Sequence, residues 1–382
     1  MKTIIIAPGA FKHSLSAREA AEAMARGLER SGLEGERVIL PIADGGNGTL
    51  DAFLANGGER IETTVRDPLN RPTRAALGLL PDGETAVVEM ALASGLELLR
   101  ADELDALGAS TYGTGQLLQT ALERGARRIV VGMGGSATVD GGAGALQALG
   151  VRLLDAQGVD IPPGGGGLSR VTQVDSSRLD ARWREVDVII ASDVTNPTIG
   201  ETGAAAVFGP QKGASAEDVV ILEHNLTHFF GVVREQVGVD VLAVEGGGAA
   251  GALSAGLMAF LGGRIESGVD LLLDFNGFDA HLKNAGLVLT GEGQMDAQTV
   301  YGKGPIGVAR RAREQGVATV ALVGGLNTDD AVLHEAGIAA VLPVIPKPMT
   351  LEAALEQAAA LVEGAALRLG YLLQIQVMDR SS

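Results

Sequence analysis

The sequence predicts an α/β protein in which parallel strands alternate with helices, and three observations lead to this prediction. Hydrophobic residues make up 46% of the 382 residues but aromatic residues only 3%, so the core must consist mainly of Ala, Val, Leu and Ile. The 55 glycines suit the short loops that join strands buried on both faces. Aliphatic runs alternate with amphipathic segments at both ends of the chain, as in a doubly wound parallel sheet.

The N-terminal part of the chain follows this alternation. We expect a strand at 3–7, a helix at 14–32 and a second strand at 37–43. Ser16 and Glu19 have the spacing of a capping box at the start of the helix. The further strands and helices expected before residue 132 are the strands 60–67, 73–80, 85–90 and 127–131 and the helices 50–58 and 114–126.

The middle of the chain is richer in glycine and less regular. Residues 156–171 have the density of Gly and Pro expected of an irregular connection. Residues 186–193 form a clear buried strand, whereas 215–238 and 248–263 have the pattern of helices. The second of these helices is almost wholly apolar, so we expect it to be buried.

The C-terminal part returns to regular alternation. We expect strands at 287–290, 318–325 and 339–345, a loop at 291–296, and helices at 305–316 and 350–369. The chain therefore predicts a discontinuous Rossmann-like or flavodoxin-like parallel-sheet domain from both chain ends, with a second α/β domain inserted into it. We expect the first domain to comprise 1–75 plus 289–382 and the second 76–288, with the active site in the cleft between them.

Composition excludes several classes of protein. The formal net charge of −17 argues against nucleic acid or an anionic membrane as a partner, because both need a basic surface. The absence of cysteine excludes disulfides and thiolate metal sites. We see no apolar stretch that approaches the length needed to span a bilayer, nor a signal-peptide core at the N-terminus. The sequence thus predicts a cytoplasmic protein, with homo-oligomerisation left open.

The stretch GMGGSATVDGGAG, residues 132–144, contains six glycines and follows a buried strand. Glycine loses the most conformational freedom on folding, so such a run is costly unless something must approach the backbone closely. A strand, a glycine loop and a helix start can together aim backbone N–H groups at an anion, and a phosphate is the first candidate. Three of the six lysines, Lys12, Lys212 and Lys303, also occur in loops of this kind.

Aspartates occur at or near the ends of three expected strands. They are Asp44 in ADGGNGT, Asp193 in SDVTNP and Asp296 in GEGQMD. Because ligands bind at the carboxyl ends of parallel strands, these carboxylates could converge to hold Mg²⁺ or to accept a proton from a hydroxyl group. Each aspartate alone could instead simply cap the backbone of its own turn.

Of two standard nucleotide-binding motifs, one is absent from the sequence and the other is present. The P-loop pattern is absent, because Lys212 and Lys303 are each followed by glycine. The pattern G-x-G-x-x-A does occur at Gly132, Gly134 and Ala137, with Asp155 at a plausible distance for a ribose. A dinucleotide-dependent oxidoreductase is therefore an alternative, although SATVDGGAG would delay the helix beyond the usual Rossmann position.

Several long motifs resemble the bacterial glycerate kinase family, in order and over nearly the whole chain. They are ADGGNGT, TYGTGQLL, GARRIVVGMGGSATVDGGAGALQALG, SDVTNPTIGETGAAAVFGPQKGA, AAGALSAGLMAFLG and LVLTGEGQMDAQTVYGKGPIGVA. The resemblance implies the two-domain fold, ATP and Mg²⁺ as cofactors, and phosphorylation of D-glycerate to 2-phosphoglycerate. Its alternatives are a kinase shifted to another small hydroxy acid and a relative that binds without catalysis.

The resemblance also implies roles for individual residues. Asp193 becomes the leading candidate for the base, and Asp296 and Asp193 become candidates for magnesium ligands. The remaining candidates are Asp44 and Lys12 for catalysis, and Gly134, Gly135, Ser136, Asp140, Lys212 and Asn196 for substrate or phosphate binding. Positioning and charge neutralisation are most of what phosphoryl transfer demands.

The chain departs from the family pattern at presumed site positions. Gly9 and Ala10 stand where the family usually has Asp and Ser, and Val139 stands where it usually has Asn. Gln294 replaces a usual Arg, and Asn47 replaces a usual Glu. We expect the loss of the carboxylate at position 9 to reshape the substrate pocket.

Overall fold

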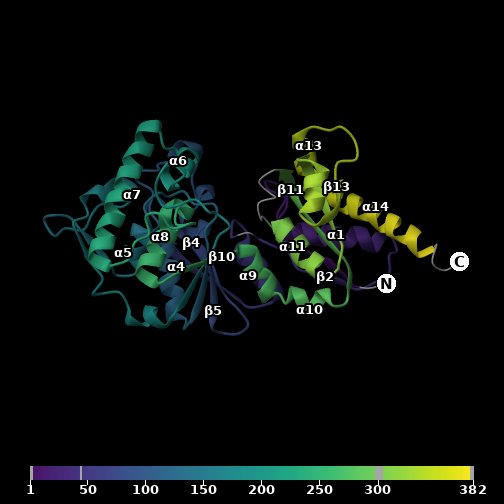
Figure 1. Ribbon diagram of the computed structural model, residues 1–382, viewed down its shortest axis with the longest axis horizontal. Helices are drawn as coiled ribbons and strands as arrows, with labels where there is room; N and C mark the ends of the chain where they lie inside the picture. Colours follow the sequence, from purple (N-terminus) through teal and green to yellow (C-terminus); the bar gives the residue numbers. More distant parts are fainter. Residues whose placement is uncertain (1–2, 44, 297–303, 379–382) are drawn as a thin grey trace. The chain divides into compact units, whose positions relative to one another are not determined.

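A computed structural model describes residues 3–43, 45–296 and 304–378 (Figure 1). The chain divides into two compact units: the first comprises Met1–Asp44, Asp51–Asn56 and Val269–Ser382, and the second Gly45–Leu50 and Gly57–Gly268. The predicted α/β class is confirmed, with a parallel-sheet unit formed by both chain ends and a second α/β unit inserted. The first unit ends before residue 57 and not at 75, because the antiparallel hairpin of residues 59–79 joins the second sheet. It resumes at Val269 and not at 289, so residues 269–288 also belong to the first unit.

The first unit has a five-stranded parallel sheet in the order β13-β12-β11-β1-β2. Aliphatic residues in β1 and in the first halves of β11 and β12 are buried, as expected for strands covered on both faces. The strands are β1 (Thr3–Ile6), β2 (Arg37–Ile39), β11 (Ala285–Asp296), β12 (Thr319–Asn327) and β13 (Ile338–Pro343).

Helices α1 (Ala17–Arg30), α10 (Phe278–Leu282), α11 (Gly304–Glu314), α12 (Asp330–Glu335) and α14 (Ala358–Met378) pack against strands of this sheet. The remaining helices of this part of the chain are α9 (Gly268–Phe275), α13 (Leu351–Glu356) and α2 (Thr49–Phe53), which begins in the second unit, with the 3₁₀ turn η1 (Leu54–Asn56). The predicted capping box of α1 is confirmed: the Ser16 amide donates to the Glu19 carboxylate at 2.8 Å, and the Glu19 amide donates to Ser16 Oγ at 3.2 Å.

Helices α1 and α14 lie side by side (Figure 1). Small residues allow the close approach, since a Cβ on Gly27 would lie 2.2 Å from the Glu363 carbonyl oxygen. The expectation that no apolar stretch approaches membrane-spanning length is wrong for α14. Its window Ala358–Ile375 has a mean hydropathy of 1.3 and is long and apolar enough by length and composition alone. A third of that window is buried within the first unit, on the side where α14 packs against α1.

The second unit has a six-stranded mixed sheet in the order β10-β9-β6-β5-β4-β3. Strands β5, β6, β9 and β10 are parallel, whereas β3 and β4 form an antiparallel hairpin. The strands are β3 (Glu59–Arg66), β4 (Pro72–Leu79), β5 (Thr85–Glu89), β6 (Arg128–Gly132), β9 (Asp187–Ala191) and β10 (Arg264–Glu266), with a separate pair β7 (Arg152–Leu154) and β8 (Gln173–Asp175).

The helices of this unit pack around two connected aliphatic cores. They are α3 (Ala91–Ser94), α4 (Tyr112–Glu123), α5 (Ala143–Ala148), α6 (Ala204–Phe208), α7 (Ala216–Val237) and α8 (Ala249–Leu261), with the 3₁₀ turns η2 (Leu96–Leu98), η3 (Ala101–Glu103), η4 (Gly165–Arg170), η5 (Ala181–Glu185) and η6 (Pro210–Lys212). The predicted burial of 248–263 is confirmed for nearly all of α8.

One expected loop is a strand. Residues 291–296 continue β11 and pair with β12, from Gly291 opposite Leu322 to Asp296 opposite Asn327. Gly291 permits this pairing because a Cβ there would lie 2.1 Å from the Leu322 carbonyl oxygen. The sequence GEGQMD does not have the apolar pattern of a strand, because Met295 is the one residue in it with a fully buried side chain.

Candidate active site

The parallel strands of the second unit end at one edge of its sheet. Glu89 at the end of β5 is in register with Gly132 of β6, and Gly132 is in register with Ala191 of β9. The glycine loop of residues 132–144 follows β6, and Asp193 follows β9 two residues after its end. This edge is where an open parallel sheet binds its ligands.

The glycines at the start of this loop allow backbone to pack on backbone. A Cβ on Gly134 would lie 2.4 Å from the Cα of Gly46, and a Cβ on Gly135 would lie 2.2 Å from Oδ1 of Asn47. The Gly134 amide donates to the Gly45 carbonyl at 2.8 Å. The glycines at 134 and 135 therefore allow the segment 45–50 of the same chain to pack closely against the loop. This contact cannot be predicted from the sequence alone.

Asp140 is buried and accepts hydrogen bonds from three residues. Its carboxylate accepts from the Thr111 amide at 2.8 Å, from the Thr111 hydroxyl at 2.8 Å, and from the amides of Gly142 and Gly144 at 3.1 and 3.2 Å. Burial raises the pKa of Asp140, and these hydrogen bonds oppose the rise. The carboxylate thereby ties the loop to the N-terminal end of α4.

The start of α5 is capped from within the protein. Besides the amides that Asp140 binds, the Ala145 amide donates to Thr111 Oγ1 at 2.9 Å. The sequence predicts that this helix start faces an anion. In the structure its amides are already used, and α5 is only six residues long. Anion binding at this edge must therefore use other donors.

Lys212 is 1% exposed and lies beneath the glycine loop. Its Nζ donates to Ser136 Oγ at 2.7 Å and to the Thr138 carbonyl at 2.7 Å. Burial lowers the pKa of Lys212 to about 7, while the negative charge of Asp140 opposes this shift. The lysine thus changes its charge close to neutral pH. The structure brings together Lys212, Ser136 and Asp140, three of the residues predicted for substrate or phosphate binding.

Two amides at the tip of the loop remain available. Within the described residues, neither the Gly135 nor the Ser136 amide donates a hydrogen bond. Gly135 is exposed and has a φ of +77°, a conformation that favours glycine. These two neighbouring donors, one of them on the residue whose hydroxyl accepts from Lys212, can hold an anionic oxygen.

Two carboxylates near this edge, Glu89 and Glu97, are not among the site residues predicted from the sequence, and both bind the segment 45–50. Glu89 is buried, and its carboxylate accepts from the amides of Gly48 and Leu50, both at 3.0 Å. The Asn47 side chain donates to Glu97 Oε1 at 2.6 Å. The sequence signal for Glu89 is a charged residue at the end of an otherwise uncharged, buried strand, TAVVE.

The loop after β9 carries two of the predicted residues. Asp193 is partly buried and is followed by a segment that contacts the loop before α8, where the Gly248 amide donates to the Asn196 carbonyl at 3.0 Å. The Asn196 side chain donates to the Thr202 carbonyl at 2.8 Å. In this arrangement Asn196 stabilises its own loop, whereas Asp193 stands at the sheet edge beside the glycine loop.

The remaining predicted residues belong to the first unit. Lys12 is exposed in the turn after β1, and Asp296 ends β11, the neighbouring strand. Asp44 and Lys303 lie outside the described residues. In the part of the chain that the structure describes, no group of three or more His, Asp or Glu side chains is arranged to hold a metal ion.

The same architecture occurs in a known crystal structure. It is described as a candidate glycerate kinase 2 from Salmonella typhimurium LT2, with a TM-score of 0.88, 42% identity and 99% of both chains covered. The fold and the site thus define a two-domain α/β enzyme of the kinase type.

Sequence comparison gives the family. The chain is 46% identical to the glycerate kinase of Bacillus subtilis (strain 168) over 361 residues, 94% of each chain. It is 44% identical to the glycerate 2-kinase of Escherichia coli (strain K12) over 353 residues, 92% of each chain. The model of the glycerate kinase family matches residues 4–374. The chain belongs to the glycerate kinase family, and this membership implies the use of ATP.

Proposed function

We propose that this protein uses ATP to phosphorylate D-glycerate at the 2-hydroxyl group. The observation that carries the proposal is the 44% identity to a glycerate 2-kinase over 92% of both chains. The chemistry at the edge of the second sheet supports it, because phosphoryl transfer needs mainly positioned donors and positive charge. The oxidoreductase alternative fits less well, because α5 begins at Ala143, six residues after Ala137 of the G-x-G-x-x-A pattern.

In this proposal Asp193 is the base that accepts the proton of the attacking hydroxyl group. The amides of Gly135 and Ser136 bind oxygens of the phosphoryl group, with Gly134 shaping the loop. Lys212 supplies positive charge from below through its hydrogen bond to Ser136. Asp140 and Asn196 act as positioning residues, because the observed hydrogen bonds of both side chains go to the protein itself.

Lys12, Asp44 and Asp296 of the first unit remain proposed participants. Lys12 would neutralise phosphate or the carboxylate of the substrate, and Asp44 would assist catalysis. Asp296, and Asp193 of the second unit, also remain proposed as Mg²⁺ ligands, because carboxylate oxygens are the ligands that this ion prefers. When bound, the ion would neutralise charge on the phosphates of ATP. A cytoplasmic location and the lack of nucleic-acid or membrane partners also remain predictions.

An assay of ADP release tests the proposal. Purified protein is mixed with ATP, Mg²⁺ and a set of small hydroxy acids: D-glycerate, L-glycerate, glycolate and D-lactate. We expect D-glycerate to give the highest kcat/KM, and Asp193→Asn to lower it by at least about 100-fold. Turnover that is faster with another acid would instead establish the substrate-shifted kinase.

Asp187→Asn is the matched control. Asp187 begins β9, the strand that Asp193 follows, but at the opposite edge of the sheet, where its carboxylate pairs with Arg128 and Arg264. We expect this variant to keep the activity of the unmodified protein. Equal losses in both variants would show that Asp193 matters only for folding of the strand.

A further inference from the structure

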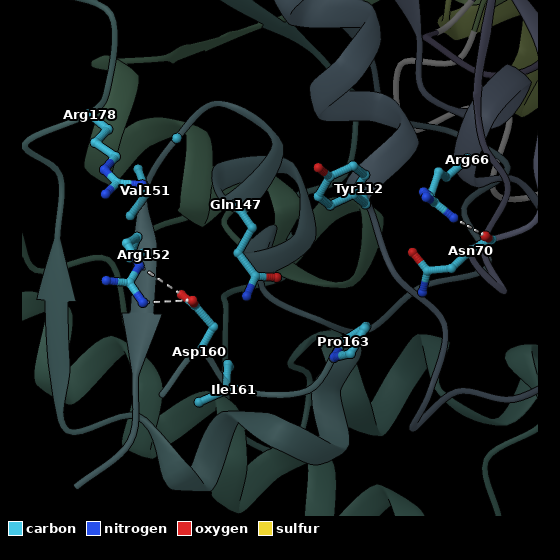
Figure 2. A pocket seen from close by; sticks show the side chains of 11 residues that line it. Arg66, Asn70, Tyr112, Gln147, Val151, Arg152, Asp160, Ile161, Pro163 and Arg178 are labelled. Atoms are coloured by element: carbon cyan, nitrogen blue, oxygen red, sulfur yellow. Dashed lines mark hydrogen bonds and ion pairs between the residues drawn. The ribbon is translucent and has the colours of Figure 1, made fainter. Parts of the chain in front are cut away.

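A second candidate binding site lies within the second unit, apart from the glycine loop. It is an open pocket of about 450 Å³, bounded by the ends of β3 and α5, the start of α4, and β7 with its following turn (Figure 2). This volume is within the range of pockets that hold small organic ligands.

The pocket carries three arginines in a chain whose net charge is −17. Arg152 forms two hydrogen bonds with Asp160, at 3.3 and 2.8 Å. The Arg178 side chain makes no hydrogen bond or ion pair with another described residue. Hydrogen bonds from Ser177 lower the pKa of nearby Asp175, and the positive charges of Arg152 and Arg178 lower it further. On one side the pocket therefore retains unused donors for an anion.

A third cation lies on the opposite side. Arg66 donates to the Asn70 carbonyl at 2.7 Å and is otherwise exposed. Figure 2 shows Arg66 and Asn70 facing the Arg152–Asp160 pair across the pocket, with Tyr112 and Gln147 between them. Within the described residues, the Tyr112 hydroxyl and the Gln147 amide have no hydrogen-bond partner.

We propose that this pocket binds an organic anion with two separated acidic groups, a phosphorylated carboxylic acid, with one group at Arg152 and Arg178 and the other at Arg66. Guanidinium groups match the planar oxygen pairs of carboxylates and phosphates. The ring and hydroxyl of Tyr112 and the amide of Gln147 would contact the body of the ligand, which carries hydroxyl groups.

The pocket adjoins the residues that hold the glycine loop. Tyr112 follows Thr111, which donates to Asp140 and accepts from the Ala145 amide. Gln147 lies in the same short helix as Ala145. A ligand that fixes Tyr112 and Gln147 thereby stabilises the supports of the loop, so its binding changes the affinity of the loop for anions. This last consequence rests on the proposed function, whereas the binding itself does not.

Isothermal titration calorimetry with 3-phosphoglycerate as the probe tests the proposal. We expect Arg178→Gln to weaken binding at one class of site by about tenfold or more, the loss expected for a charged hydrogen bond. Arg66→Gln should weaken the same class of site. Both side chains are exposed, so neither substitution threatens the fold. Arg184→Gln, an exposed arginine of η5 outside the pocket, should leave binding unchanged.

The results of these titrations test the pocket independently of the proposed function. Identical isotherms for the unmodified protein, Arg178→Gln and Arg66→Gln would overturn the proposal and assign any binding to the loop site. A protein that binds the probe in the pocket but does not phosphorylate glycerate would overturn the proposed function and leave the pocket assignment standing. A titration with inorganic phosphate distinguishes a phosphate site from one that needs both acidic groups.

Discussion

The ammonium group of Lys212 lies 2.7 Å from the hydroxyl oxygen of Ser136, and the lysine is almost completely buried beneath the glycine loop. A buried cation costs free energy unless a negative charge is near. Asp140 supplies part of that compensation, yet burial still lowers the pKa of Lys212 to about 7. An anion bound at the loop would therefore raise the pKa of Lys212 and keep its ammonium group fully charged.

The first prediction concerns the pH dependence of stability. In the unfolded chain Lys212 keeps an ordinary pKa of 10.5, so between about pH 7 and that value the unfolded state binds more protons. The free energy of unfolding of the native protein should therefore rise with pH across this window relative to that of Lys212→Met. The slope of the difference approaches about 1.4 kcal/mol per pH unit. Urea unfolding of both proteins at pH 6.5, 8 and 9.5 measures it.

Parallel curves for the two proteins over this range would contradict the lowered pKa. Lys347→Met serves as control, because Lys347 is exposed and its loss should leave the pH dependence unchanged. Lys212→Met also loses the hydrogen bonds to Ser136 and Thr138. That loss lowers its free energy of unfolding by the same amount at every pH, so it does not change the slope of the difference between the two proteins.

The second prediction concerns Asp140. Asp140→Asn leaves one acceptor oxygen where the carboxylate now serves donors from Thr111, Gly142 and Gly144. We expect the variant to lose about 2–4 kcal/mol of stability, since buried N–H groups then lack partners. Chemical unfolding measures this. Asp102→Asn is the control, because among the described residues its exposed carboxylate pairs with exposed Arg100 alone, and it should change stability by less than about 0.5 kcal/mol. A similarly small effect at Asp140 would refute its positioning role.

The third prediction concerns the approach of the segment 45–50 to the glycine loop. Gly134→Ala places a Cβ 2.4 Å from Gly46 Cα, so the two backbones must separate. We expect at least a tenfold lower kcat/KM and a loss of about 1–3 kcal/mol in stability. Gly231→Ala lies in helix α7, where the new Cβ would have no described atom within 4 Å outside the local helix backbone and its chain neighbours. This variant should instead be neutral or stabilise the protein. Full activity in Gly134→Ala would show that this packing does not shape the site.

The fourth prediction concerns the departure at position 9. In the part of the chain that the structure describes, a Cβ on Gly9 would lie in ordinary contact with the Gly291 carbonyl oxygen, at 3.7 Å, so this backbone position accepts a Cβ. Restoring the family carboxylate with Gly9→Asp should lower the KM for D-glycerate at least threefold, by adding an acceptor for a substrate hydroxyl group. Steady-state kinetics beside Gly9→Ala separates the carboxylate from the added bulk. An unchanged KM would mean that position 9 is remote from the substrate.

Much of the fold could be predicted from the sequence, because its signals are local. The aliphatic strands, the capping box of Ser16 and Glu19, and the apolar helix α8 all follow from spacing and burial. The continuation of β11 to Asp296 could not, since its glycines are explained only by the partner strand beside them. The antiparallel hairpin β3–β4 joins the second sheet for a similar reason: its pairing is decided by tertiary contacts.

The candidate site was predictable in its residue types but less so in their roles. Ser136 and Lys212 were both predicted, and the structure joins them by a hydrogen bond. The role of Asp140 could not be read from the sequence, because its partner Thr111 lies 29 positions away. Glu89 was overlooked as a site residue for the same reason, since its link to the segment 45–50 exists only in the folded chain.

The central claim is that this protein transfers a phosphoryl group from ATP to the 2-hydroxyl of D-glycerate with Asp193 as the base. ³¹P NMR of the protein with D-glycerate, ATP and Mg²⁺ tests it most directly, with an Asp193→Asn sample alongside. We predict the resonance of 2-phosphoglycerate in the first sample and its loss in the second. Intact ATP in the first sample, or a product phosphorylated at another hydroxyl group, would contradict the claim.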